Sequence, residues 1–255
     1  MTYLTLGPED LDEHHLCCAL GDPKHRAGVE AKRAWLRSRM AEGLVFRKLD
    51  VRGKVFIEYA PAEVAWRPVV APGFLVVHCL WVSGRFAKQG HGRALLRSCM
   101  DDAERQGKAG VVVASAKRKR PFLADPRFLA RMGFEVVDVA GEWRLYAWRG
   151  PAGRDARVPR LAEAVHRGAA APTSAGSFVA TVTDQCPFNR HWAEVVASDL
   201  RAAGHEARVR SIDTVAEAQQ VASPLGAYGL TRGEGLVAHH LTTTKATGRL
   251  VGKLG

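Results

Sequence analysis

The sequence predicts an α/β fold in two units, and three observations support this prediction. Phe74–Val82 is an apolar, β-branched run of the kind that forms a buried strand. Segments with strand and helix patterns alternate before and after it. Residues 150–176 are rich in Gly, Ala, Pro and Arg, as expected of a linker between residues 1–149 and residues 177–255. A length of 255 residues also exceeds the usual size of one domain.

The elements of residues 1–149 follow from periodicity and from helix and turn signals. Before the central run we expect a strand at Thr2–Leu6, a helix from Pro8 that carries residues 15–19, a helix at Lys24–Met40, and hairpin strands at Leu44–Leu49 and Lys54–Ala60, the second extending towards Trp66. After it we expect a helix ending near Gly107, a strand at Val111–Ala114, a short helix or two turns in Pro121–Met132, and strands at Gly133–Asp138 and Trp143–Trp148.

The second unit shows a β-α-β-α-β-β order. The expected elements are a strand at Phe178–Thr183, a helix to about Ala203, a strand at Ala207–Ile212, a helix at Thr214–Ala222, and strands at Leu225–Leu230 and Leu236–Leu241. Arg232-Gly233-Glu234-Gly235 is a hairpin signal between the last two strands. One short helix is also expected within the linker, at Pro159–Arg167.

Composition excludes some classes of protein. The formal net charge of +11 suits an anionic ligand, but no Lys/Arg stripe interleaved with aromatic residues is present, which disfavours a nucleic-acid groove. No apolar run approaches the roughly 20 residues that span a membrane. The five cysteines are odd in number and include no Cys-x-x-Cys pair, so we expect a reduced protein in the cytoplasm.

Two glycines, Gly90 and Gly92, lie between the central strand and the helix that follows it. Glycine lets a ligand approach the backbone closely, and a helix N-terminus presents free N–H groups and a positive dipole end. The combination predicts an anion cradle suited to a diphosphate. The amides expected to line it belong to Lys88, Gln89, Gly90, His91, Gly92 and Arg93.

This loop resembles the acetyl-CoA loop of the GNAT acyltransferases. Val82, Gly90 and Gly92 match that family's motif, whereas Ala87 stands where Arg or Gln is usual. The resemblance implies an α+β GNAT fold whose mixed sheet has a central strand that binds acetyl-CoA. It also implies that the thioester and pantetheine chain lie against the backbone of Leu80, Trp81 and Val82.

Longer phrases on both sides resemble GNAT acetyltransferases with a C-terminal YoaP domain. They are His15-x-Cys17-Cys18-Ala19, Val55-Phe56-Ile57-Glu58-Tyr59-x-Pro61-Ala62-Glu63, Cys79-Leu80-Trp81-Val82-Ser83-Gly84, Pro121-Phe122-Leu123-x-Asp125 and Gly133-Phe134-Glu135-Val136-Val137-Asp138. The resemblance implies an acetyl-CoA-dependent N-acyltransferase in which a small amine or a protein amine attacks directly in a ternary complex. The second unit looks like a small thioredoxin-like domain.

The catalytic residues are less clear, because the usual positions of the family's Glu and Tyr are Val76 and Leu129. His78 shares a strand face with Val76 and could be the base, although a core histidine is the more frequent case. Glu58, on the neighbouring strand, and Glu63 are further candidate bases, with a surface or salt-bridged carboxylate as the alternative for each. Tyr59 is a candidate acid, with core packing as its alternative.

Cysteines support a different hypothesis, in which a thiol-redox or ligand-binding module uses Cys186 and the first unit has lost its activity. Cys186 lies at a helix start, which favours the thiolate, but Asn189 stands where a resolving cysteine would be. Cys79 is expected to face the opposite side of its strand from His78. Packing is expected of His15, Cys17 and Cys18, and we predict no metal site.

Overall fold

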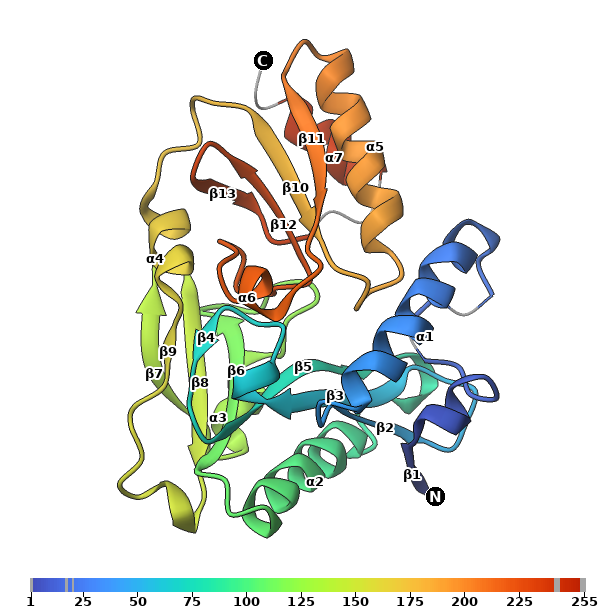
Figure 1. Ribbon diagram of the computed structural model, residues 1–255, viewed down its shortest axis with the longest axis vertical. Coiled ribbons are helices and arrows are strands. Elements are labelled where there is room, and N and C mark those ends of the chain that lie inside the picture. Colours follow the sequence, from blue (N-terminus) through green and yellow to red (C-terminus); the bar gives the residue numbers. More distant parts are fainter. Residues whose placement is uncertain (1, 17, 20, 241–243, 253–255) are drawn as a thin grey trace.

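The structure is a computed structural model that describes residues 2–16, 18–19, 21–240 and 244–252. The two predicted units lie one above the other along the long axis of the molecule, each built on its own sheet (Figure 1). Within the described ranges, no helix is long and apolar enough to cross a membrane.

The first unit contains a mixed seven-stranded sheet. Its strands lie in the order β1 (Tyr3–Leu6), β2 (Val45–Leu49), β3 (Val55–Pro61), β5 (Phe74–Val82), β6 (Gly110–Ala116), β8 (Trp143–Arg149) and β7 (Glu135–Ala140). Strands β5 and β6 run parallel, and the other neighbouring strands run antiparallel. The predicted central strand therefore lies in the middle of the sheet.

Helices cover both faces of this sheet (Figure 1). Helix α2 (His91–Arg105) packs on one face, together with α3 (Pro126–Arg131), because its apolar residues recur at helical spacing and are fully buried. Helix α1 (Arg26–Met40) packs on the other face through Trp35 and Leu36. Side chains of β3 alternate between the two cores, as the pleat requires.

A β-bulge interrupts the alternation in β5. Glu58 is paired with Cys79 and Tyr59 with Val77, so His78 is an extra residue on β5. As a result, His78 and Cys79 both lie on the α1 face, where His78 meets Trp35. The prediction that Cys79 faces away from His78 was wrong, because it assumed an unbroken period of two.

The second unit is a four-stranded sheet in the order β11 (Ala207–Ser211), β10 (Phe178–Val182), β12 (Tyr228–Arg232) and β13 (Gly235–Ala238). Strands β10 and β11 are parallel, and the other pairs are antiparallel. Helices α5 (Asn189–Ala202) and α7 (Thr244–Val251) contact each other, and α6 (Val215–Ala218) lies towards the first unit (Figure 1). The observed order is the predicted one with α7 added.

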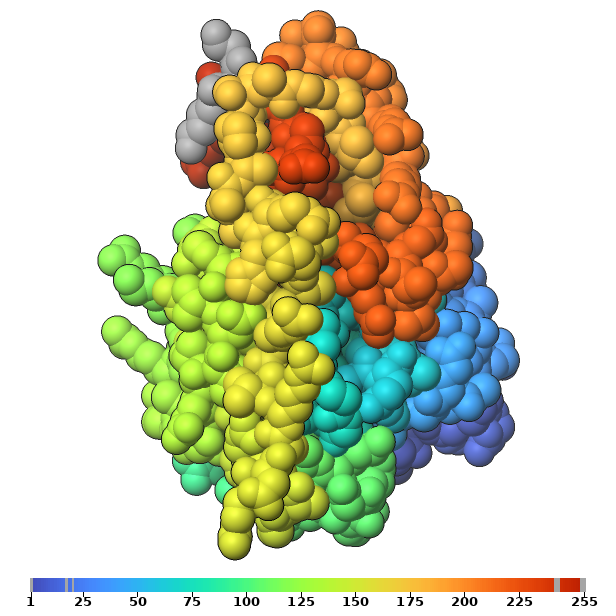
Figure 2. Space-filling model, turned by 60° about the vertical axis from the view of Figure 1, so that its left-hand side comes forward, coloured from blue at the N-terminus to red at the C-terminus, as the bar shows by residue number. Residues whose placement is uncertain are grey.

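Residues 150–176 are packed against both units. Strand β9 (Arg160–Leu161) pairs with β4 (Val69–Val70), and α4 (Glu163–Ala170) contacts both β7 and β13. Leu161 and Val165 are buried in the core of the first unit. Figure 2 shows this segment, in yellow, running over the surface from the first unit to the second. The stretch therefore joins the two units through fixed contacts.

Two local predictions were wrong. The helix expected from Pro8 to residue 19 is only a 3₁₀ turn, Pro8–Leu11, followed by irregular chain. Strand β3 does not extend towards Trp66, because it ends at Pro61 and the turn Ala62–Val64 follows.

Candidate functional site

The predicted cradle is a hollow at the N-terminus of α2, with a volume of about 400 Å³. Lys88 and Gly90 have φ values of +62° and +84°, which turn the chain sharply into the helix. The first-turn N–H groups have no carbonyl partner within the helix and so are available to an anion. The lining residues are Val82, Ala87, Lys88, Gly90, His91, Gly92, Arg93, Phe128, Arg131 and Met132.

Side chains of the cradle leave its floor open. The His91 ring turns inward, where its Nδ1 lies 2.7 Å from the Tyr3 hydroxyl, so His91 offers the hollow its backbone. Gln89 donates to the Arg85 carbonyl at 2.6 Å. A Cβ placed on Gly92 would lie 3.8 Å from both Val82 and Phe128, which shows that Gly92 faces the hollow.

The sequence did not point to three residues of this hollow, Phe128 and Arg131 on α3 and Met132 directly after it. The first two lie on the helix itself. Their spacing of three residues puts them on one face of the helix, and that spacing was the available signal. Arg131 places a permanent cation beside the free N–H groups of α2. The N-terminus of α2 on one side of the hollow and Arg131 of α3 on the other are therefore both suited to bind a phosphate group.

Beyond the cradle, the central strand separates from its neighbour. The pairing of β5 with β6 ends at Val76, so the outer half of β5 has no β6 partner. Leu80, Trp81 and Val82 lie in this outer half and are half-buried. The unpaired edge of β5 can hydrogen-bond an extended amide chain, and it leads from the hollow into the sheet.

On the α1 face of the sheet lies a buried ion pair between Glu58 of β3 and Lys32 of α1. Gln185, from the loop after β10 in the second unit, joins this pair. Its backbone carbonyl accepts from Lys32 Nζ at 2.9 Å, and its Nε2 lies 3.4 Å from Glu58 Oε2. Both units therefore contribute to one buried polar cluster.

Arg67 fixes the orientation of the Gln185 amide. Arg67 Nη1 donates to Gln185 Oε1 at 2.7 Å and to the Trp66 carbonyl at 2.8 Å, and Nη2 donates to the His78 carbonyl. Because Arg67 can only donate, Oε1 must face it and Nε2 must face Glu58. Burial lowers the pKa of Arg67 to about 10, which leaves it charged at neutral pH.

The sequence and fold of this site can be compared with known proteins. Residues 9–134 match the model of the Acetyltransferase (GNAT) family. The chain is 43% identical over 143 residues, or 56% of its length, to a protein of Bacillus subtilis described as the uncharacterized N-acetyltransferase YoaP. That match covers 57% of YoaP. Residues 9–134 are therefore similar to the GNAT acetyltransferases. This agrees with the family resemblance found in the sequence.

Two solved structures are also similar to the chain. One is the paia N-acetyltransferase of Thermoplasma acidophilum in complex with coenzyme A, with 13% identity and a TM-score of 0.40, covering 59% of this chain and all of that one. The other is a GNAT family acetyltransferase of Brucella melitensis in complex with acetyl-CoA, with 19% identity and a TM-score of 0.36, covering 59% and 88%.

Within residues 9–134, His78 is placed unfavourably for a base. Its side chain is buried, and Nε2 accepts from the Trp66 N–H at 3.2 Å. Burial, followed by the charges of Arg67 and Lys32, holds the pKa of His78 well below its usual value. A group that resists protonation this strongly is poorly suited to take a proton from an amine.

Tyr59 lies on the other face of the sheet, in the core beneath α2. Its hydroxyl donates to the Asp102 carboxylate, and the side chain is fully buried. Burial raises the pKa of Tyr59 well above its usual value. The candidate acid is therefore separated by the sheet from the candidate base Glu58.

Four of the five cysteines lie within the described residues. Cys17 lies outside the described residues. Cys18, Cys79 and Cys186 are half-buried, and burial raises the pKa of Cys79 well above its usual value. The Asn189 amide is engaged with the Ala227 carbonyl at 2.6 Å. Across the described ranges, no group of three or more His, Cys, Asp or Glu side chains could hold a metal ion.

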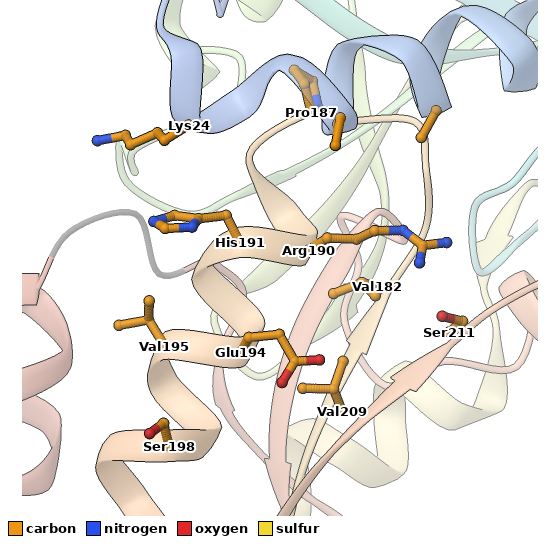
Figure 3. Close-up of a pocket in the computed structure, with 13 residues that line it drawn as sticks. Lys24, Val182, Pro187, Arg190, His191, Glu194, Val195, Ser198, Val209 and Ser211 are labelled. Carbon is orange, nitrogen blue, oxygen red and sulfur yellow. The ribbon is translucent and has the colours of Figure 1, made fainter.

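A cleft of about 780 Å³ lies where α1 meets the second unit (Figure 3). Its apolar lining comes from α1, β10, β11 and α5, including Gly28, Val182 and Val209. Arg190 and Glu194 extend from α5 into the same space. Ala31 of α1 lines the cleft, whereas Lys32, Glu58 and Gln185 are not among the lining residues.

Proposed function

We propose that this protein transfers an acetyl group from acetyl-CoA to an amine by direct attack in a ternary complex. The observation that carries this proposal is the geometry around β5. An open helix N-terminus lies at one end of a central strand that has parted from its neighbour, and a buried carboxylate lies on the strand beside it.

The diphosphate of acetyl-CoA binds, in this proposal, to the amides of residues 88–93, with Arg131 as a further cation. The pantetheine chain then runs along the unpaired edge of β5 at Leu80–Val82. Several relatives by fold support the choice of ligand, since those of Thermoplasma acidophilum and Brucella melitensis are complexes with coenzyme A and acetyl-CoA. The backbone binds the phosphates, so Ala87 in place of Arg or Gln is tolerated.

Glu58 is our choice of general base. Its Oε1 is held by Lys32. Among the residues that the structure describes, Oε2 has only the long contact to Gln185, so it can accept a further hydrogen bond. In the reaction the amine nitrogen bonds to the thioester carbon, the C–S bond breaks, and the amine proton passes to Glu58, directly or through one water. The departing thiolate takes a proton from solvent.

The second unit is proposed to be thioredoxin-like and to cover the acceptor side of the sheet. Its strand order and its β-α-β-α-β-β sequence of elements support this assignment. The cleft between α1 and α5 would hold the body of the acceptor, which is a small amine or an amine of a protein. No contact in the described structure favours the thiol-redox alternative.

Calorimetric titration with acetyl-CoA tests the proposal. We expect saturable binding by the wild type and by Cys186→Ser, followed by thiol release when a panel of amines is added. The Glu58→Gln variant should bind acetyl-CoA normally and release thiol at least about 100-fold more slowly, the usual scale of general-base assistance. If the wild type does not bind acetyl-CoA, the proposal is wrong.

A further inference from the structure

We infer that Gln185, supplied by the second unit, is a positioning residue that holds Glu58 in place for acetyl transfer. The inference rests on the proposed function and goes beyond it, because it makes the second unit part of the reaction. The contacts that carry it cross between the two units over 118 to 153 residues of sequence.

The polar side chains around Glu58 are all buried. Glu58 has no exposed surface, and Lys32, Arg67 and Gln185 are each at most 4% exposed. Buried polar groups need partners, because each unpaired one costs about 1–3 kcal/mol, and charged ones cost more. The sequence of the first unit supplies Lys32 to one oxygen of Glu58. The second oxygen contacts Gln185, a residue of the other unit.

The orientation of the Gln185 side-chain amide is also fixed. A glutamine amide can turn over, which would bring its oxygen against Glu58 and repel it. Arg67 prevents this, since its donation at 2.7 Å requires the Gln185 oxygen to stay on the Arg67 side. The Nε2 group is then directed at Glu58 Oε2 and at the His78 carbonyl, each 3.4 Å away. Arg67 thus fixes the Gln185 amide, and this amide in turn sets the orientation of the Glu58 carboxylate.

Other charged and titratable groups around Glu58 belong to each element packed against it. They are Lys32 on α1, Arg67 after the 3₁₀ turn, His78 and Cys79 on β5, and Cys186 beside Gln185. Gln185, by contrast, gives a donor to Glu58 Oε2 without bringing a charge. A neutral donor orients the carboxylate and leaves its capacity to accept a proton.

The chain offers a matched control for this residue. Gln219, on the second unit, also crosses between the units, but its Nε2 donates only to the backbone carbonyls of Ala62 and Ala65, at 3.3 and 3.2 Å. If the glutamines serve only to dock the two units, the two substitutions should have similar effects. If Gln185 positions Glu58, its substitution should lower the reaction rate, whereas the substitution of Gln219 should not.

The experiment measures thiol release from acetyl-CoA with water as the acceptor, together with calorimetric binding of acetyl-CoA. We expect Gln185→Ala to lower the rate about tenfold or more at unchanged acetyl-CoA affinity, and Gln219→Ala to change neither. Gln185→Glu keeps the size of the side chain and sets a second carboxylate against Glu58. It should therefore move the rising limb of the pH–rate profile upward by roughly one pH unit.

Three results would overturn the inference. They are equal losses for Gln185→Ala and Gln219→Ala, an unshifted profile for Gln185→Glu, and a wild type that binds acetyl-CoA but releases thiol no faster than buffer. Absence of acetyl-CoA binding by the wild type would instead overturn the proposed function, so the two failures can be told apart. Melting temperatures of all variants show whether any of them has simply unfolded.

Discussion

Replacing Gly92 by Glu should abolish acetyl-CoA binding while leaving the fold intact. The side chain would extend into the hollow, because a Cβ at this position lies 3.8 Å from Val82 and Phe128. Those distances are ordinary van der Waals contacts, and Gly92 is not among the described glycines with positive φ. The backbone therefore accepts the substitution without strain.

The expected loss can be worked out from the charges. At about 5 Å and an effective dielectric constant of about 20, each pair of like charges costs about 3 kcal/mol. One such pair between the new carboxylate and the diphosphate lowers affinity more than about 100-fold. Two pairs would put binding beyond detection by calorimetry at ordinary concentrations.

Calorimetric titration with acetyl-CoA measures this loss, and thermal unfolding checks the fold. Gly248→Glu is the matched control, since Gly248 also lies in a helix with no atom near its Cβ position, and α7 is remote from the cradle (Figure 1). A folded Gly92→Glu protein that binds acetyl-CoA as tightly as the wild type would show that the diphosphate lies elsewhere.

Three further predictions concern a buried tyrosine, a buried histidine and the cleft between α1 and α5. Tyr59→Phe should lower the free energy of unfolding, measured by urea titration, by about 1–3 kcal/mol, because Asp102 loses a hydrogen-bond donor. The rate of acetyl transfer should not change. A stable variant with tenfold lower turnover would instead support an acid role for Tyr59. Burial lowers the pKa of His240 to about 4, so the unfolded chain binds the proton first and the free energy of unfolding should fall as pH drops from about 6.5 to 4. The urea midpoint of His240→Phe should fall less over this range than that of the wild type. Equal falls in the two midpoints would contradict the prediction. Ser198→Trp should fill the cleft and slow transfer to an amine acceptor at unchanged acetyl-CoA affinity; an unchanged acceptor KM would remove the cleft from the acceptor site.

Periodicity predicted the strand and the helix on either side of the hollow. The apolar run that became β5 and the helical stripe that became α2 are both long and regular, and the glycines between them mark the turn. These signals are local, so one sequence is enough to find them. The helix expected after Pro8 failed because its acidic start is followed by no sustained apolar period.

The buried polar cluster could not be predicted in the same way. Lys32 lies on a helix where a lysine usually faces solvent, and only a partner on another strand makes it a core residue. Gln185 meets Arg67 across 118 residues, a distance at which periodicity carries no information. The bulge at His78 reversed the face assigned to Cys79, because a strand pattern read from sequence assumes regular alternation.

Hydrogen exchange of the backbone amides on addition of acetyl-CoA tests the central claim most directly. The account predicts slower exchange at Lys88–Arg93 and along Leu80–Val82, where the cofactor would cover free N–H groups, and little change in α7. Binding of acetyl-CoA that left the exchange of Lys88–Arg93 unchanged would contradict it.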